Sequence, residues 1–172
     1  MLRHNAQPLQ DSDQLNRFEF HTRMACAHPT LIVDDANEFQ PDAVLCLEQN
    51  GGSWVTDEDY LAGAPELILE IAEDTTTYEF NEKRDVYCRI GVKEYIVWTL
   101  ADKETHWHRL QDGQYLPAHV DNEGIVRSTV FPGLDLHAKA LLQGDMSLVL
   151  ATMQAGIESA AHAEFMKTLG GQ

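Results

Sequence analysis

The sequence predicts a single α/β domain. Three features carry the prediction: short apolar runs, one amphipathic segment between them, and a hairpin signal further along the chain. The apolar runs cover residues 31–33, 43–47, 67–72 and 94–100, and turn-forming residues follow or precede them. Nearly continuous apolar runs of this length are typical of strands covered on both faces. Because the order is strands, helix, strand, hairpin and helix within 172 residues, we expect one α/β domain.

Residues 78–90 have the pattern of an amphipathic helix between two of these strands. The polar residues at 74–77 offer N-cap side chains, and Val86, Tyr87 and Ile90 fall on or near one helical face. Gly91 is the residue type that commonly ends a helix. The pattern therefore predicts a helix over 78–90.

Turn signals organise the rest of the chain. Asp112-Gly113, between residues 106–110 and 113–115, predicts a β-hairpin, since this dipeptide suits a tight two-residue turn. The other expected features are loops at 49–53, 57–59 and 63–65, a turn at 131–134 and helical structure at 138–169.

Composition restricts the class of protein. The net charge of −16 argues against a surface that binds nucleic acid as a whole, because phosphates would be repelled. It is compatible with a carboxylate site for a divalent cation, since the ion changes the local charge. No apolar run approaches the roughly 20 residues of a membrane helix. The first 17 residues lack the apolar core of a secretory signal, so we expect a cytoplasmic protein.

Cysteines and histidines do not form a metal site by their spacing. Buried free thiols are expected at the three cysteines, which fit neither a disulfide framework nor a Cys-x-x-Cys site: Cys26, Cys46 and Cys88. His106 and His108 alternate with Trp107, so both histidines face the same side of a strand. With no third ligand nearby, an exposed hairpin face is favoured over a metal site.

Two acids stand where core packing does not explain them. Asp42 follows Pro41 at the start of one apolar run, and Glu70 lies inside another. A carboxylate within an apolar strand costs several kcal/mol unless it is paired or coordinated. Two such acids on neighbouring strands can share a divalent cation, and Mg²⁺ prefers oxygen ligands together with several waters. A metal-bound water is an effective nucleophile near neutral pH, and the metal can neutralise a phosphodiester transition state.

Lys83 supplies a third element one helical turn before Tyr87, from where it can point toward the ends of the two strands. An ammonium there can orient the attacking water or stabilise charge on phosphorus. Because the ligands of the ion are oxygens, loss of Lys83 is expected to leave metal affinity nearly unchanged.

Each of these residues also has an ordinary structural interpretation. Asp42 can be a turn residue at a strand start, and Glu70 can pair with an arginine such as Arg84 or Arg89. Lys83 can be a solvated helix lysine. These alternatives stay open at the level of the residues alone.

Four segments together resemble a known family. They are E-F-Q-P-D-A-V-L-C-L (38–47), G-A-P-E-L-I-L-E-I-A (63–72), E-K-R-D-V-Y-C-R-I-G-V-K-E-Y-I-V-W (82–98) and V-F-P-G-L (130–134). In order and spacing the chain resembles the Uma-two group of restriction endonuclease-like proteins, a branch of the PD-(D/E)XK nuclease superfamily. The resemblance spans residues 31–142.

The resemblance implies a restriction-endonuclease-like core, with a central mixed sheet flanked by helices. It also implies Asp42 and Glu70 as catalytic metal ligands, with Mg²⁺ as cofactor and Mn²⁺ as a substitute. The usual lysine two residues after the second acid is replaced by Ala72, and Lys83 matches the lysine that this group carries on the following helix. Tyr87 matches the helix tyrosine of the family, as a support residue. The implied activity is endonucleolytic hydrolysis of nucleic acid, with DNA as the expected partner.

The N-terminus departs from the family pattern, because residues 1–20 lack its usual Y-E-L-I-D-G-E-like motif. We therefore expect an N-terminally short member with three parts: a polar lead-in at 1–30 in place of the usual helical region, a nuclease-like domain at 31–142 and a helical extension at 143–172. A sheet face exposed by this difference favours a homodimer. The difference at the N-terminus and the acidic charge also favour a competing hypothesis. In this hypothesis the chain is a catalytically inactive, nuclease-fold binding or interaction module.

Overall fold

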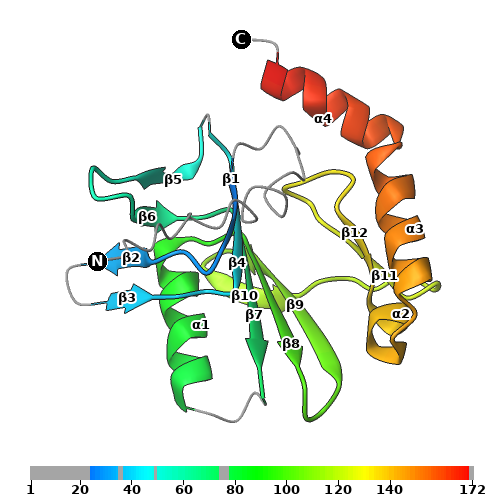
Figure 1. The fold of residues 1–172 in the computed structure, drawn as a ribbon, viewed down its shortest axis with the longest axis horizontal. Helices are drawn as coiled ribbons and strands as arrows, with labels where there is room; N and C mark the ends of the chain where they lie inside the picture. Colours follow the sequence, from blue (N-terminus) through cyan, green and yellow to red (C-terminus); the bar gives the residue numbers. More distant parts are fainter. Residues whose placement is uncertain (1–23, 35–36, 49, 74–77, 171–172) are drawn as a thin grey trace, which may run out of the picture.

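A six-stranded sheet forms the centre of the fold (Figure 1). The computed structural model describes residues 24–34, 37–48, 50–73 and 78–170. The strands of this sheet, in spatial order, are β1 (Met24–Ala27), β4 (Ala43–Cys46), β7 (Leu67–Ala72), β8 (Glu94–Thr99), β9 (Glu104–Gln111) and β10 (Gln114–Pro117). Only the β7–β8 pair is parallel among the five pairs of this sheet, so the predicted mixed sheet is confirmed.

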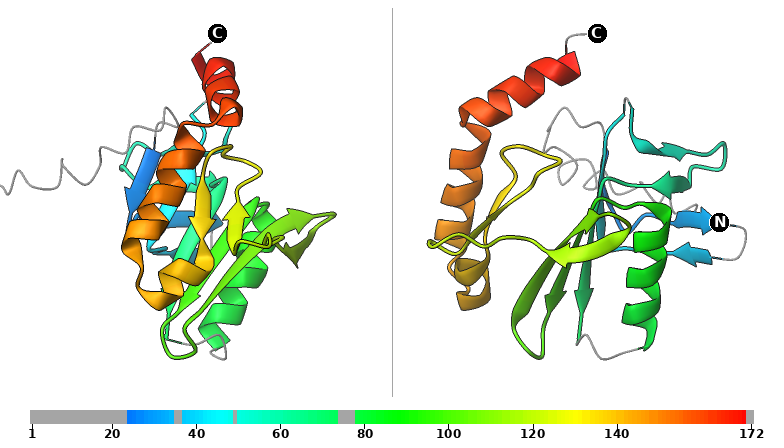
Figure 2. Two further views of the ribbon diagram at one scale, coloured as in Figure 1. Left: turned by 90° about the vertical axis from the view of Figure 1, so that its right-hand side faces the viewer. Right: turned by 180° about the vertical axis from the view of Figure 1, so that it is seen from behind.

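Helix α1 (Tyr78–Ile90) connects the parallel strands β7 and β8, as a crossover between parallel strands requires. The predicted helix over 78–90 is therefore confirmed, and Gly91 follows it with a φ of 95°. Helices α2 (Ala138–Gln143), α3 (Met146–Ile157) and α4 (Ala160–Gly170) form the C-terminal part. α1 and α3 lie on opposite sides of the six-stranded sheet (Figure 2).

Smaller sheets complete the fold. A four-stranded sheet has the order β3 (Asn37–Phe39), β2 (Leu31–Asp34), β6 (Leu61–Ala64), β5 (Gly52–Val55). A two-stranded sheet pairs β11 (Ile125–Arg127) with β12 (Asp135–His137). Together these elements form a mixed α/β fold, consistent with a restriction-endonuclease-like architecture.

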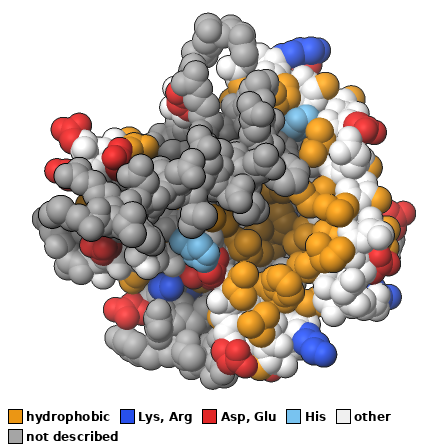
Figure 3. Space-filling model, viewed as in Figure 1, with side chains coloured by type: hydrophobic (Ala, Val, Ile, Leu, Met, Phe, Trp, Pro, Cys, Tyr) orange, Lys and Arg blue, Asp and Glu red, His pale blue; other side chains and the backbone are white. Residues whose placement is uncertain are grey.

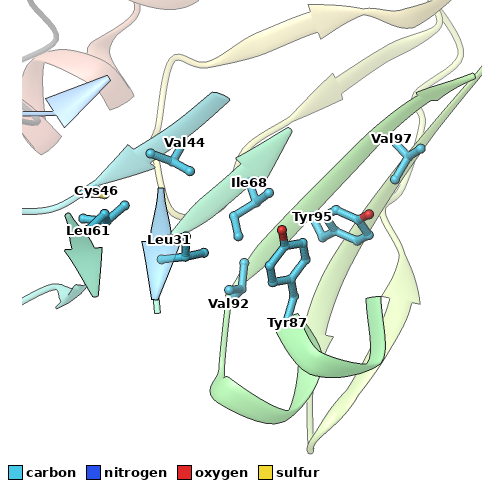
Figure 4. Packing of buried hydrophobic residues seen from close by; sticks show 9 residues of the cluster. All are labelled: Leu31, Val44, Cys46, Leu61, Ile68, Tyr87, Val92, Tyr95 and Val97. Carbon is cyan, nitrogen blue, oxygen red and sulfur yellow. The ribbon is translucent and has the colours of Figure 1, made fainter. Parts of the chain in front are cut away.

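The face of the sheet that meets α1 carries the first core cluster (Figure 4). Tyr87 on α1 is fully buried beside the sheet residue Tyr95, with ring centroids 5.3 Å apart in an edge-on arrangement. The ring of Phe39 also packs edge-on against Tyr87, with the ring centroids 5.6 Å apart. Such edge-on aromatic pairs add specific geometry to apolar burial. The cluster therefore fixes the position of α1 on the sheet.

The opposite face of the sheet carries a second cluster, which includes Leu67, Ile96, Trp107 and Phe131. An apolar cavity of about 260 Å³ lies on this face, between the sheet and the C-terminal elements (Figure 3). It is lined by Ala43, Val44, Leu45, Leu67, Leu69, Ile96, Trp107, Leu134, Asp135, Leu136 and Met153.

The predicted hairpin is confirmed as β9 and β10. Gln111 pairs with Gln114 across a two-residue turn, and Asp112 and Gly113 both have positive φ, at 50° and 77°. A two-residue hairpin turn with positive φ at both central positions is the type that favours Asp-Gly.

Three segments differ from the expectation. The predicted loop at 49–53 overlaps β5, which begins at Gly52. The predicted lead-in at 1–30 contains β1, which pairs with β4 at the edge of the central sheet. The predicted loop at 63–65 overlaps β6, because residues up to Ala64 pair with β5. Gly63 leaves room for the ring of Trp54, since a Cβ at this position would lie 2.7 Å from that ring. Residues 1–23, which include the rest of the lead-in, lie outside the described part of the chain.

A buried carboxylate at the start of β8 provides a stability prediction. Glu94 is fully buried, accepts hydrogen bonds from Ser128 Oγ at 2.6 Å and Thr129 N at 2.8 Å, and lies 3.6 Å from Arg109 Nε. Glu94→Ala is expected to lower the free energy of unfolding by about 3–5 kcal/mol, because buried donors lose their acceptor. Urea denaturation measures this, with the exposed Glu104→Ala as control. Equal stabilities of the two variants would contradict it.

Candidate metal centre

Asp42 is placed by the pairing of β4 with β7. The register aligns Ala43 with Leu69, and continuing it by one residue sets Asp42 opposite Glu70. Asp42 Oδ2 accepts a hydrogen bond of 2.7 Å from the backbone N of Ile71. Asp42 therefore lies directly before β4, beside Glu70 on the adjacent strand β7, and the continued register places both side chains on the same side of the sheet.

Glu70 contacts both predicted helix residues. Its side chain is 8% exposed, Oε1 accepts a hydrogen bond of 2.9 Å from Tyr87 Oη, and Oε2 lies 3.3 Å from Lys83 Nζ. Lys83 and Tyr87 are one turn apart on α1, so the same helical face presents both groups to β7. The fold thus brings all four predicted site residues together.

The alternative pairings of Glu70 are wrong. Arg84 pairs with Asp85, and Arg89 pairs with Asp34 on β2. Lys83 is not a solvated helix lysine either, since only 16% of its side chain is exposed.

His28 is a neighbour of the site that sequence reasoning did not identify. Its Nδ1 lies 3.7 Å from Asp42 Oδ1, and its backbone N donates to the carbonyl oxygen of Asp42 at 3.0 Å. The residue has a φ of 51°, in the left-handed region that side chains adopt infrequently. The position follows β1, within the segment interpreted as a lead-in, and no motif marks it.

Burial raises the pKa of Glu70 above its usual value. The positive charge of Lys83 and the hydrogen bond from Tyr87 oppose this shift, and the negative charge of Asp42 adds to it. Burial, followed by the charge of Glu70, raises the pKa of Tyr87. Tyr87 therefore stays protonated at neutral pH and acts as a hydrogen-bond donor to the carboxylate.

A protein-family model described as "Uma2: Putative restriction endonuclease" matches residues 3–139, which include all four of these residues. The chain belongs to the Uma2 family. No curated protein matches the sequence. Within the described residues, no helix is both long enough and apolar enough to cross a membrane.

The donor set of this Uma2 chain fits a hard divalent cation. The described residues contain no cluster of three or more acidic, histidine or cysteine side chains suited to a metal ion. Asp42 and Glu70 can supply two carboxylates, which suits Mg²⁺ because this ion retains several waters and takes few protein ligands. The remaining positions would be left to water and substrate.

The histidines of the hairpin lie apart from this centre in their contacts. The rings of His106 and His108 stack with centroids 6.4 Å apart, and His106 Nε2 lies 3.1 Å from Glu104 Oε2. His108 is half-buried against Tyr95 and Tyr115, and burial lowers its pKa. The expected exposed face is therefore only partly exposed. Of the cysteines, Cys46 is buried and Cys88 half-buried, and the side chain of Cys26 lies outside the described part.

If Asp42 and Glu70 hold a divalent cation in this Uma2 chain, the raised pKa of Glu70 predicts a pH dependence of that binding. The ion needs the charged carboxylate, so affinity for Mn²⁺ should fall with decreasing pH at a higher pH than an ordinary glutamate allows. Below the raised pKa, affinity falls about tenfold per pH unit. Calorimetric titrations over a pH series measure this.

The raised pKa of Glu70 also affects folding stability, but with the opposite dependence on pH from that of metal affinity. The folded chain favours protonated Glu70, so this residue's contribution to stability is present at low pH and declines as pH rises through the raised pKa.

Tyr87→Phe removes a hydrogen bond to the charged form of Glu70 and should move the pH dependence of Mn²⁺ binding to higher pH. An unchanged profile in Tyr87→Phe would show that this bond does not influence the titration.

Proposed function

We propose that this chain is a Mg²⁺-dependent endonuclease that hydrolyses phosphodiester bonds in nucleic acid, with DNA as substrate and Mn²⁺ as a substitute ion. The observation that carries the proposal is the position of Asp42, directly before β4, opposite Glu70 on β7, with Lys83 in contact with Glu70. The family description, which names restriction endonucleases, supports the same reaction.

Each residue has a distinct role in this proposal. Asp42 and Glu70 hold the ion, and the hydrogen bond from Ile71 N orients the Asp42 carboxylate. Tyr87 orients Glu70 through its hydroxyl. Lys83 provides an ammonium that stabilises negative charge on the phosphate in the transition state. When bound, the ion would supply Lewis acidity toward water and the phosphate oxygens.

The charge of the site suits an anionic substrate once an ion is bound. Two carboxylates and one ammonium sum to a charge of −1, and a divalent cation changes this to +1. A phosphodiester is therefore attracted to the loaded site, although the whole chain carries a charge of −16. The loaded site would therefore attract a nearby phosphate, whereas the net charge of the chain would not attract nucleic acid over long distances.

The net charge favours a second candidate function, an inactive nuclease-fold module that binds another partner. Strong overall repulsion weakens any nucleic-acid complex that depends on many phosphate contacts. The two candidates differ in one assay. The endonuclease converts supercoiled plasmid to nicked and linear forms in Mg²⁺ or Mn²⁺ and stops when EDTA is added. An inactive module leaves the plasmid supercoiled in both ions at protein concentrations in excess of DNA.

A further inference from the structure

Lys83 and a divalent cation require the same carboxylate. Lys83 Nζ lies 3.3 Å from Glu70 Oε2, while Tyr87 donates to Oε1 of the same group. Asp42 Oδ2 accepts from the backbone of Ile71. Three of the four carboxylate oxygens of the site therefore accept a hydrogen bond from the protein, and one of these three donors carries a positive charge.

Holding both the Lys83 ammonium and a divalent cation on the Glu70 carboxylate is unfavourable in this environment. The side chains of Lys83 and Glu70 are 16% and 8% exposed, so water screens their charges poorly. A divalent cation on Glu70 would repel an ammonium held on the same group. Tyr87 creates no such conflict, because its hydroxyl is neutral, and neither does the amide of Ile71.

We propose that Lys83 competes with the divalent cation for Glu70, so that ion binding displaces the ammonium from Glu70 Oε2 and leaves it available to the substrate phosphate. This inference rests on the proposed function, since it concerns the same metal site. The long, flexible lysine stem allows the ammonium to move while α1 stays on the sheet. Lys83 then lowers the affinity of the site for the metal ion, and the position of its ammonium depends on whether the ion is bound.

The test is a titration of the purified chain with MnCl₂ and MgCl₂ by calorimetry, at mildly alkaline pH. Lys83→Met removes the competing charge and keeps the apolar stem. Its dissociation constant for Mn²⁺ should be lower than that of the wild type by at least about tenfold, because a repulsion between cations has been removed. Lys83→Gln serves as a second variant, since its neutral amide can still donate to Glu70 if Met destabilises the fold.

Lys93 provides a matched control. Its Nζ lies 3.5 Å from Oε1 of the fully buried Glu66, whose oxygens also accept hydrogen bonds from Leu47 N and Gly52 N. Lys93→Met therefore removes a lysine from another buried glutamate without touching Asp42 or Glu70. Its affinity for Mn²⁺ should equal that of the wild type.

The outcomes separate this inference from the proposed function. Tighter binding in both Lys83 variants, with Lys93→Met unchanged, supports the competition. Equal binding in wild type and folded Lys83 variants overturns it, while the metal site stands. Absence of binding in every variant overturns the competition and the metal-dependent function together.

Discussion

Asp42→Asn and Glu70→Gln are each expected to lower the rate of plasmid cleavage by at least about 10³-fold in Mg²⁺, since each removes a charged ligand from an ion that supplies several kcal/mol of transition-state stabilisation. Each substitution keeps one oxygen acceptor, whereas in Glu70→Gln an amide nitrogen replaces one carboxylate oxygen, so the contacts with Tyr87 and Lys83 cannot both be kept. Asparagine can still accept from Ile71 N, and glutamine can still accept from Tyr87. The loss should therefore come from metal binding, measured in parallel by calorimetry.

Asp34→Asn is the control for this pair. Asp34 is an exposed carboxylate that pairs with Arg89 from the same helix that carries Lys83. Its neutral variant should cleave at the wild-type rate, and all three variants should have melting temperatures near that of the wild type. If Asp42→Asn and Glu70→Gln unfold more readily and the folded fraction keeps its activity, the two acids are structural.

Lys83→Ala is expected to reduce turnover by about 10²–10³-fold, the usual cost of losing one donor to transition-state charge. Lys83→Arg should not restore full activity, because the planar guanidinium is larger and differently directed. Single-turnover cleavage at saturating Mn²⁺ measures this effect without interference from altered metal affinity. The expected combination is unusual: a variant that binds the ion more tightly and cleaves more slowly.

Lys93→Ala provides the comparison, because Lys93 also contacts a buried glutamate, but that residue is Glu66 and not Glu70. It should retain wild-type turnover. If an active wild type and Lys83→Ala cleave equally fast, Lys83 has no role in the chemistry, whatever its effect on metal affinity.

Local signals were sufficient to predict the helix that carries the site. N-cap residues, apolar periodicity and Gly91 together predicted residues 78–90, and the structure has the same bounds. The apolar run around Glu70 predicted its central strand for a similar reason, since burial on both faces leaves a continuous pattern. The contact between Lys83 and Glu70 then follows because α1 comes directly after β7 in the chain and packs against the sheet that contains it.

Pairings between distant segments could not be predicted in the same way. β1 is short and pairs with β4 about twenty residues later in the sequence, so no local period marks it. His28 approaches Asp42 only because this pairing exists. The expectation that Lys83 is irrelevant to metal affinity considered ligand chemistry alone. The 3.3 Å contact on a buried carboxylate changes that expectation, because charge competition depends on burial.

The candidate site and the apolar cavity share two strands, back to back. Along β4 and β7, Asp42 and Glu70 alternate with Ala43 and Leu69, which line the cavity on the other face. A one-residue insertion or deletion inside either strand would exchange these faces, turning an acid toward the cavity. Evolutionary changes in length are therefore expected to accumulate in the exposed 56–60 connection between β5 and β6 and to avoid residues 42–46 and 67–70.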